Sequence, residues 1–161
     1  MAVYKLLDDF YEHAFSLIAI HGSLEDFRLA YFLNATAGLK LQRLKNDLLV
    51  NGDERYPVFE WYDEMKEVHW NLVKNRSRMQ YEQTIKQTSM FEGKSAYKTT
   101  CLIPEYPKVD FFLKIDNEGK YPYTAVLTQR IKDIPQVITA YEIEPKQLKS
   151  KNNLIFLTDA Y

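Results

Sequence analysis

Short runs that alternate apolar and polar residues are the main feature of this chain, and two segments between them are predicted to be helices. The clearest run is 109–115, in which every second residue is apolar: Val109, Phe111, Leu113 and Ile115. Alternation with a period of two is typical of a strand that turns one face toward the core. We therefore expect an α+β domain, in which helices pack on a mainly antiparallel sheet.

The first strong apolar run, 14–20, ends at Gly22 and is predicted to be a strand. Both of its faces are apolar, so we expect it inside the sheet with both faces covered. A helix is predicted next. Ser23 is its expected N-cap, Asp26 the acid of a capping box and Gly38 its C-terminal stop.

A second helix is expected from Pro122, which suits the first turn of a helix. Its apolar stripe has helical spacing and consists of Tyr123, Leu127, Ile131 and Ile134. Between the helices we predict a polar antiparallel meander over 56–87, with strands at 58–62, 68–73 and 79–85 and a turn at 75–77. The other predicted strands are 39–44, 98–103 and 137–143.

The resulting order is β-α-β, a meander, and then β-α-β, with no repeat, linker or low-complexity segment along the chain. Two split β-α-β units usually build an antiparallel sheet with both helices on one face, the ferredoxin-like plan. We expect that plan, with the meander inserted in it, as a single domain over 1–161.

Charge and cysteine content favour a cytoplasmic protein. The 21 basic and 22 acidic residues nearly cancel, which argues against a nucleic-acid partner. Cys101 is the single cysteine, so it cannot form an internal disulfide. No apolar run approaches the 18 or so residues of a membrane span, and the first residues do not resemble a signal peptide, so we expect no membrane association.

Candidates for catalysis or metal binding are few. Cys101 lies among apolar neighbours, where a free cysteine acts as a small hydrophobe. His13 and His21 would lie about 26 Å apart on a strand, and His69 has no second ligand at metal-like spacing. Two acidic clusters suit either Mg²⁺ or plain solvent exposure: Asp8, Asp9 and Glu12, and Asp63, Glu64 and Glu67. We predict no catalytic residue, no metal site and no cofactor.

One basic and aromatic stretch offers a surface for single-stranded nucleic acid: Lys74, Arg76, Arg78, Tyr81 and Lys86. The strand at 109–115 lacks the aromatic signature with which RNA-recognition domains stack bases. An edge strand protected by basic side chains is therefore the favoured interpretation of the stretch.

A stiff loop between two predicted strands is the main candidate site. Pro104 and Pro107 bracket Glu105 and fix the shape of the loop, which presents Glu105 and Asp110 in defined positions. The loop is either a rigid recognition edge or a structural crossover whose carboxylate satisfies backbone amides. The predicted interaction site is Pro104, Glu105, Pro107 and Asp110.

The same loop carries a family resemblance. Ile103-Pro104-Glu105, three residues, and then Val109-Asp110-Phe111 resembles the signature of the IPExxxVDY family of small bacterial proteins. The stretches 16–34, 131–143 and 148–156 are also similar to that family. Phe111 stands where the signature has tyrosine, so a phenol hydroxyl cannot be essential there. The resemblance implies no particular activity, because the family is functionally uncharacterised.

Three functions follow in order of support. The first is a non-catalytic protein–protein interaction or regulatory module, with a protein partner bound at the loop. The alternative is a small-ligand-sensing homodimer, since domains of this plan often pair through their sheets. A nucleic-acid-binding protein or a metal-dependent enzyme has the least support.

Overall fold

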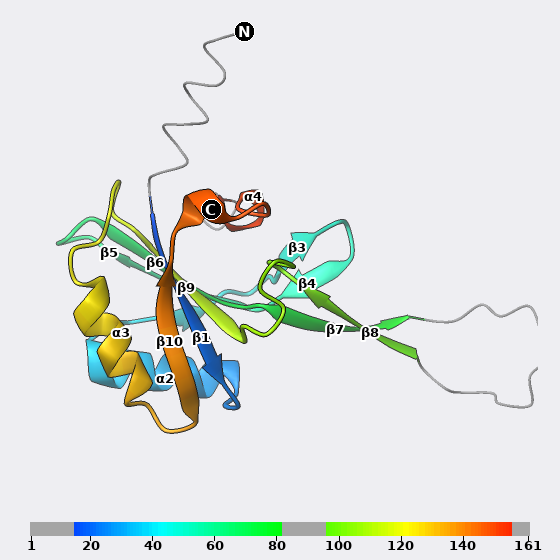
Figure 1. Ribbon diagram of the computed structural model, residues 1–161, viewed down its shortest axis with the longest axis horizontal. Helices are drawn as coiled ribbons and strands as arrows, with labels where there is room; N and C mark the ends of the chain where they lie inside the picture. The colour runs from blue at the N-terminus through cyan, green and yellow to red at the C-terminus, as the bar shows by residue number, and fades with distance from the viewer. Residues whose placement is uncertain (1–14, 82–95, 156–161) are drawn as a thin grey trace, which may run out of the picture.

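The computed structural model describes residues 15–81 and 96–155. It is an α+β fold whose main element is a six-stranded sheet in the order β10-β1-β9-β6-β5-β2, with every neighbouring pair antiparallel (Figure 1). The strands of this sheet are β1 (Ser16–Gly22), β2 (Gln42–Arg43), β5 (Val58–Asp63), β6 (Val68–Lys74), β9 (Phe111–Asp116) and β10 (Val137–Ile143).

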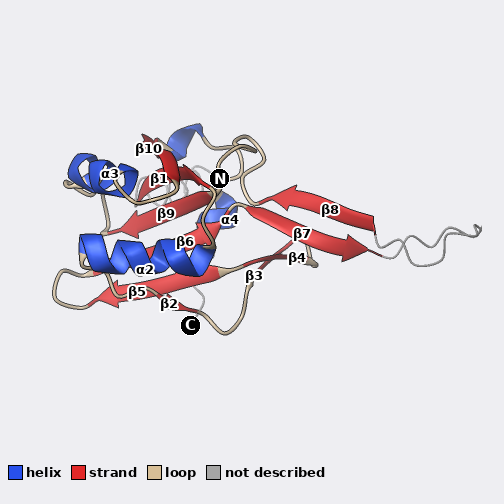
Figure 2. Ribbon diagram, turned by 90° about the horizontal axis from the view of Figure 1, so that it is seen from below, coloured by secondary structure: helices blue, strands red, loops and turns tan. Residues whose placement is uncertain are grey.

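Two hairpins lie outside the main sheet. The first pairs β3 (Leu48–Val50) with β4 (Glu54–Tyr56), and the second pairs β7 (Arg76–Tyr81) with β8 (Ala96–Cys101). Figure 2 shows the β7–β8 hairpin projecting from the end of the main sheet. The predicted meander is therefore divided, because two of its strands join the main sheet as β5 and β6, while 79–81 of the third belong to β7. The rest of that predicted strand, 82–85, lies outside the described residues.

Helices α2 (Asp26–Ala37) and α3 (Thr124–Lys132) lie on the same face of the sheet (Figure 2). Their apolar residues and one face of the strands form a single buried cluster, which includes Ile18, Leu29, Leu33, Leu113, Leu127 and Ile131. In the part of the chain that the structure describes, no helix is long and apolar enough to cross a membrane.

The opposite face of the sheet is covered by irregular chain and by the β3–β4 hairpin, which buries Tyr56 there. Residues 102–109 and the C-terminal stretch bury Leu102, Ile103, Leu148 and Leu154 there. That stretch contains a 3₁₀ turn (Pro145–Gln147) and the short helix α4 (Asn152–Ile155). Since β1 alternates between the two clusters, the prediction that both of its faces are covered is confirmed.

Several expected boundaries are wrong. Ser23 is not the N-cap of α2. The helix begins at Asp26, with Glu25 at the N-cap position and no side-chain cap, because Leu24 packs into the core before the first turn. The strand predicted at 39–44 shortens to Gln42–Arg43 at the sheet edge. The side chain of Asn34 accepts from the Leu41 amide and donates to its carbonyl, which takes that backbone out of the ladder.

Two further expectations fail near the loop. Val109 packs on the cluster opposite to that of Phe111, because β9 begins only at Phe111 and the chain before it turns. The turn predicted at 75–77 is only a bend at Asn75, since β6 ends at Lys74, β7 starts at Arg76 and Asn75 is fully buried between them. Gly38 does end α2 in the left-handed conformation, as predicted.

Candidate functional site

The predicted interaction loop holds its two carboxylates half-buried, each in hydrogen bonds with another segment of the protein. The Ser150 amide donates to one oxygen of Glu105 at 3.0 Å, and the Ser150 hydroxyl donates to the other at 2.5 Å. Burial alone would raise the pKa of Glu105, but the hydrogen bonds from Ser150 and the Lys149 backbone outweigh it and lower that pKa. Glu105 therefore anchors the C-terminal stretch to the loop.

Asp110 ties the loop to the sheet. It accepts a hydrogen bond from the Gly22 amide at 2.8 Å and forms an ion pair with Arg76. Pro104 and Pro107 are exposed. The structure thus brings the four predicted residues into one loop, but the surface that the loop offers to a partner is made by the prolines rather than by the carboxylates.

Asn75 fixes the backbone of this loop through its buried side chain, a role that the sequence pattern did not predict. Its side chain donates to the carbonyls of Tyr106 and Val109, each at 2.8 Å, and accepts from the Ile103 amide at 2.9 Å. Its own amide donates to the Asp110 carbonyl. One buried side chain therefore fixes both ends of the loop.

We expect Glu105→Gln to lower the free energy of unfolding by about 1 kcal/mol at about pH 7, a value reduced for the partial exposure of the group. The folded-state pKa of Glu105 is depressed. Its contribution is therefore complete above the pKa of the unfolded state and is lost as the pH falls through the folded-state pKa. Urea unfolding at about pH 7 and about pH 3 checks this. An equal difference between variant and wild type at both pH values would contradict the assignment.

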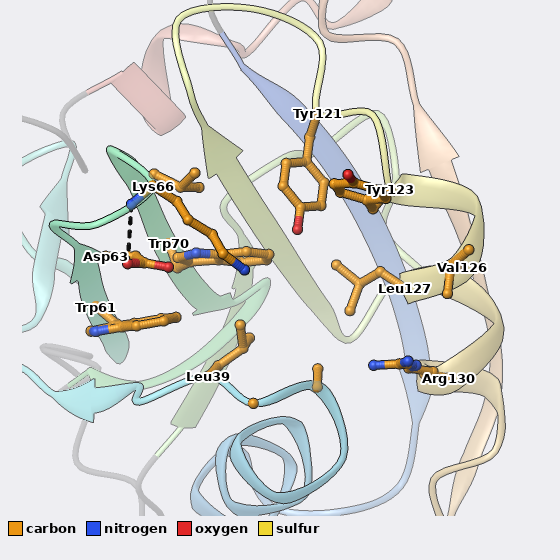
Figure 3. Close-up of a pocket in the computed structure, with 13 residues that line it drawn as sticks. Leu39, Trp61, Asp63, Lys66, Trp70, Tyr121, Tyr123, Val126, Leu127 and Arg130 are labelled. Carbon is orange, nitrogen blue, oxygen red and sulfur yellow. Dashed lines mark hydrogen bonds between the residues drawn. The ribbon is translucent and has the colours of Figure 1, made fainter.

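A different region has the features of a ligand site. A cavity of about 300 Å³ opens between the end of α2, strands β5 and β6, and α3 (Figure 3). Four aromatic side chains line it, namely Trp61, Trp70, Tyr121 and Tyr123. Apolar residues complete its wall, among them Leu39, Val68, Val126 and Leu127.

The four aromatic rings form a continuous row. Trp61 and Trp70 are cross-strand neighbours on β5 and β6, and their rings stack with centroids 6.4 Å apart and 17° between planes. Tyr121 meets Trp70 edge-on at 5.3 Å and Tyr123 at 5.6 Å. Trp70 is 4% exposed, whereas Tyr123 is 63% exposed, so the row runs from the core at Trp70 to the surface at Tyr123. Tyr123 therefore lies at the mouth of the pocket and not in the buried helical stripe predicted for it.

Charged side chains stand around this aromatic row. Lys66, from the turn between β5 and β6, and Arg130, from α3, extend toward the cavity from opposite sides (Figure 3). Within residues 15–81 and 96–155 neither of them forms an ion pair. Asp63 also lines the cavity, but one of its oxygens already accepts hydrogen bonds from the backbone amides of Met65 and Lys66.

Tyr121 adds a hydrogen-bond donor. Burial, and after it the charges of Tyr123 and Asp63, raise the pKa of the Tyr121 hydroxyl. The hydroxyl stays protonated at neutral pH and points into the cavity (Figure 3). The pocket thus combines π faces, two cations and the neutral hydroxyl of Tyr121.

Other titratable residues serve internal contacts. His69 hydrogen-bonds to Glu60 at 2.6 Å, and His21 to the Tyr141 hydroxyl at 2.9 Å. Cys101 is half-buried at the end of β8 rather than in the core. Among the described residues no group of three or more His, Cys, Asp or Glu side chains could hold a metal ion. His13 and the cluster of Asp8, Asp9 and Glu12 lie outside those residues.

Two residues of the basic stretch make contacts within the protein. Arg76 pairs with Asp110, and the Arg78 guanidinium lies 3.9 Å from the centre of the Tyr97 ring. Lys86 lies outside the described residues. These contacts fit the interpretation of Arg76 and Arg78 as parts of a protein surface more readily than as phosphate ligands.

Comparisons with known proteins add no relative to this picture, since no family model, no curated protein and no solved structure matches the chain. The resemblance to the IPExxxVDY family stays a prediction.

Proposed function

We propose that this chain is a non-catalytic regulatory module that binds a small ligand in the pocket of Trp61, Trp70, Tyr121 and Tyr123. The observation that carries this proposal is the aromatic row beside Lys66 and Arg130. Ligand sites are usually concave and mostly apolar, with a few polar groups that fix orientation. The cavity has that composition, and its volume of about 300 Å³ is at the lower end of the usual range.

Binding without catalysis fits the residues that line the cavity. Nucleophilic catalysis by a serine, threonine or cysteine side chain needs a base such as histidine beside it. Among the described lining residues there is no serine, threonine, cysteine or histidine. Asp63, the acidic member of that lining, is engaged with backbone amides of its own turn.

A thermal-shift screen against a broad metabolite panel tests the proposal. A ligand present at about 100 times its Kd stabilises the folded state by about 2.7 kcal/mol. For a chain of this length we expect Tm to rise by about 5–10 °C. Trp61→Ala should abolish the rise. Tyr31→Ala, which removes an exposed aromatic ring of α2 away from the pocket, should keep it. A panel in which no compound raises Tm would contradict the proposal.

Protein binding at the loop is a second candidate. The loop that carries the exposed Pro104 and Pro107 is fixed by hydrogen bonds of the buried Asn75 to Ile103 and Tyr106, so the loop is preformed. A preformed loop loses little entropy when it binds. Lys108→Glu changes an exposed side chain of this loop. A pull-down in which Lys108→Glu retains every partner would remove the loop from consideration.

The strand order supports the ferredoxin-like plan that we propose for the core. β1 and β6 are both antiparallel to β9, which lies between them, and β9 and β10 are both antiparallel to β1. Each helix thus connects two parallel strands that are split by a third. Strands β2, β3, β4 and β5 are then an insertion between α2 and β6.

A homodimer in the cytoplasm is the assembly that we propose for the module. β10 forms one edge of the main sheet and carries Ile138, which is 78% exposed. An exposed apolar edge strand is a ready site for pairing with a second copy. Light scattering that gives a monomer at all concentrations would contradict the dimer.

A further inference from the structure

The charges around the aromatic pocket select among the ligands that its rings could hold. Rows of tryptophan and tyrosine bind either planar rings, by stacking, or organic cations, by cation–π attraction. Lys66 and Arg130 both extend into the cavity, which would repel a cation. The aromatic row is therefore better suited to a planar ring than to a quaternary ammonium group.

The positive charges of Lys66 and Arg130 favour an anionic ligand. Among the described residues that line the cavity, Asp63 is the single acidic side chain, whereas Lys66 and Arg130 are both basic. Asp63 already accepts hydrogen bonds from two backbone amides. A concave site with an excess of one charge concentrates ligands of the opposite charge. Arginine forms paired hydrogen bonds with carboxylate or phosphate, and lysine binds either group as a point charge.

The size of the cavity limits the ligand to a small molecule. About 300 Å³ is enough for one ring system and a charged group. The cavity is bounded by the end of α2 on one side and by α3 on the other, so it is a pocket of local extent rather than a groove along the sheet (Figure 3). This favours a metabolite over a polymer strand, which would need several such sites in a line.

We propose that the pocket binds a small planar aromatic anion, with its ring against the row of Trp61, Trp70 and Tyr121 and its carboxylate or phosphate beside Lys66 or Arg130. This inference rests on the proposed function and names the chemical class of the ligand. The anionic group has two sources, a nucleoside phosphate or an aromatic carboxylic acid, and both present the same chemistry to the site.

Isothermal titration calorimetry with matched probes tests the class. Adenosine 5′-monophosphate is compared with adenosine, which lacks the charge, and with inorganic phosphate, which lacks the ring. Indole-3-carboxylate is compared with indole in the same way. We expect at least one aromatic anion to bind about tenfold or more tightly than its neutral and ringless counterparts, and the better of the two anions identifies the source.

Variants at the two cations complete the test. Lys66→Met combined with Arg130→Met should weaken the aromatic anion about tenfold or more and leave the neutral ring unchanged. Lys132→Met is the matched control, since Lys132 is an exposed cation of α3 that does not line the cavity. Near-ultraviolet circular dichroism of each variant establishes that the pocket remains folded.

Failure of the ligand class and failure of the pocket give different results. If a neutral or cationic compound binds best, or if the double variant keeps full affinity for the anion, the proposed ligand class is wrong. The proposal that the pocket is a ligand site is then still supported. If neither the probes nor any metabolite in the thermal-shift panel binds, both proposals are overturned.

Discussion

Asn75→Ala is expected to lower the free energy of unfolding by about 3 kcal/mol, one of the largest effects of any polar substitution in this protein. The side chain is fully buried and satisfies the carbonyls of Tyr106 and Val109 and the amide of Ile103. Alanine leaves these groups without their partner in a place that water reaches poorly. An unsatisfied buried group costs about 1–3 kcal/mol, and the loop can relax to recover part of the loss.

Thermal and urea unfolding measure this effect, which should appear as a fall in Tm of about 10 °C. Asn75→Asp sharpens the test, because a carboxylate can still accept from Ile103 but would face the two carbonyls without a donor. It should destabilise at least as much as alanine. Asn46→Ala, at an exposed position, is the control and should change stability by less than about 0.5 kcal/mol. A small effect at Asn75 would mean that the loop is held by other contacts.

Lys114→Ala is expected to cost about 3 kcal/mol and to loosen the C-terminal stretch. Lys114 is 1% exposed. Its ammonium donates to the Leu154 carbonyl at 2.8 Å and lies 4.7 Å from the centre of the Phe15 ring. Alanine removes both contacts and leaves a cavity under α4. Methionine keeps most of the packing, so Lys114→Met should cost less, about 1 kcal/mol.

Hydrogen exchange distinguishes a local from a global effect of these variants. The amide of Leu154, which donates to the Lys151 carbonyl, should exchange faster in both variants than in wild type. Lys98→Ala removes an exposed lysine of β8 and should change neither stability nor exchange. Unchanged protection at Leu154 in Lys114→Ala would show that this lysine does not hold the C-terminal stretch.

Local sequence pattern was sufficient to predict several of the elements. The apolar runs 14–20 and 137–143 correspond to β1 and β10, and the helical spacing of Leu127 and Ile131 corresponds to α3. Ile134 follows that helix and is buried in the same cluster. These patterns depend only on the residues of one element, and that information lies within a few positions of the chain.

The loop and the pocket could be predicted only in part, because both depend on contacts between distant segments. Asn75 precedes Arg76 and Ser77, a composition typical of a turn, and its role depends on carbonyls some thirty residues away. The partner of Glu105 is Ser150, which no local pattern indicates. Trp61, Trp70 and Tyr121 each belong to a different strand or loop, so their meeting follows from the strand order.

Nuclear magnetic resonance of the nitrogen-labelled protein tests directly whether the aromatic pocket is the ligand site. The chain has 2 tryptophans, and both line the pocket, so their indole N–H resonances report on it alone. We would record these resonances while titrating adenosine 5′-monophosphate and indole-3-carboxylate. We expect saturable shifts of both indoles and of the Lys66 amide with at least one probe. Shifts confined to residues 104–110, with both indoles unmoved, would contradict it and favour the loop.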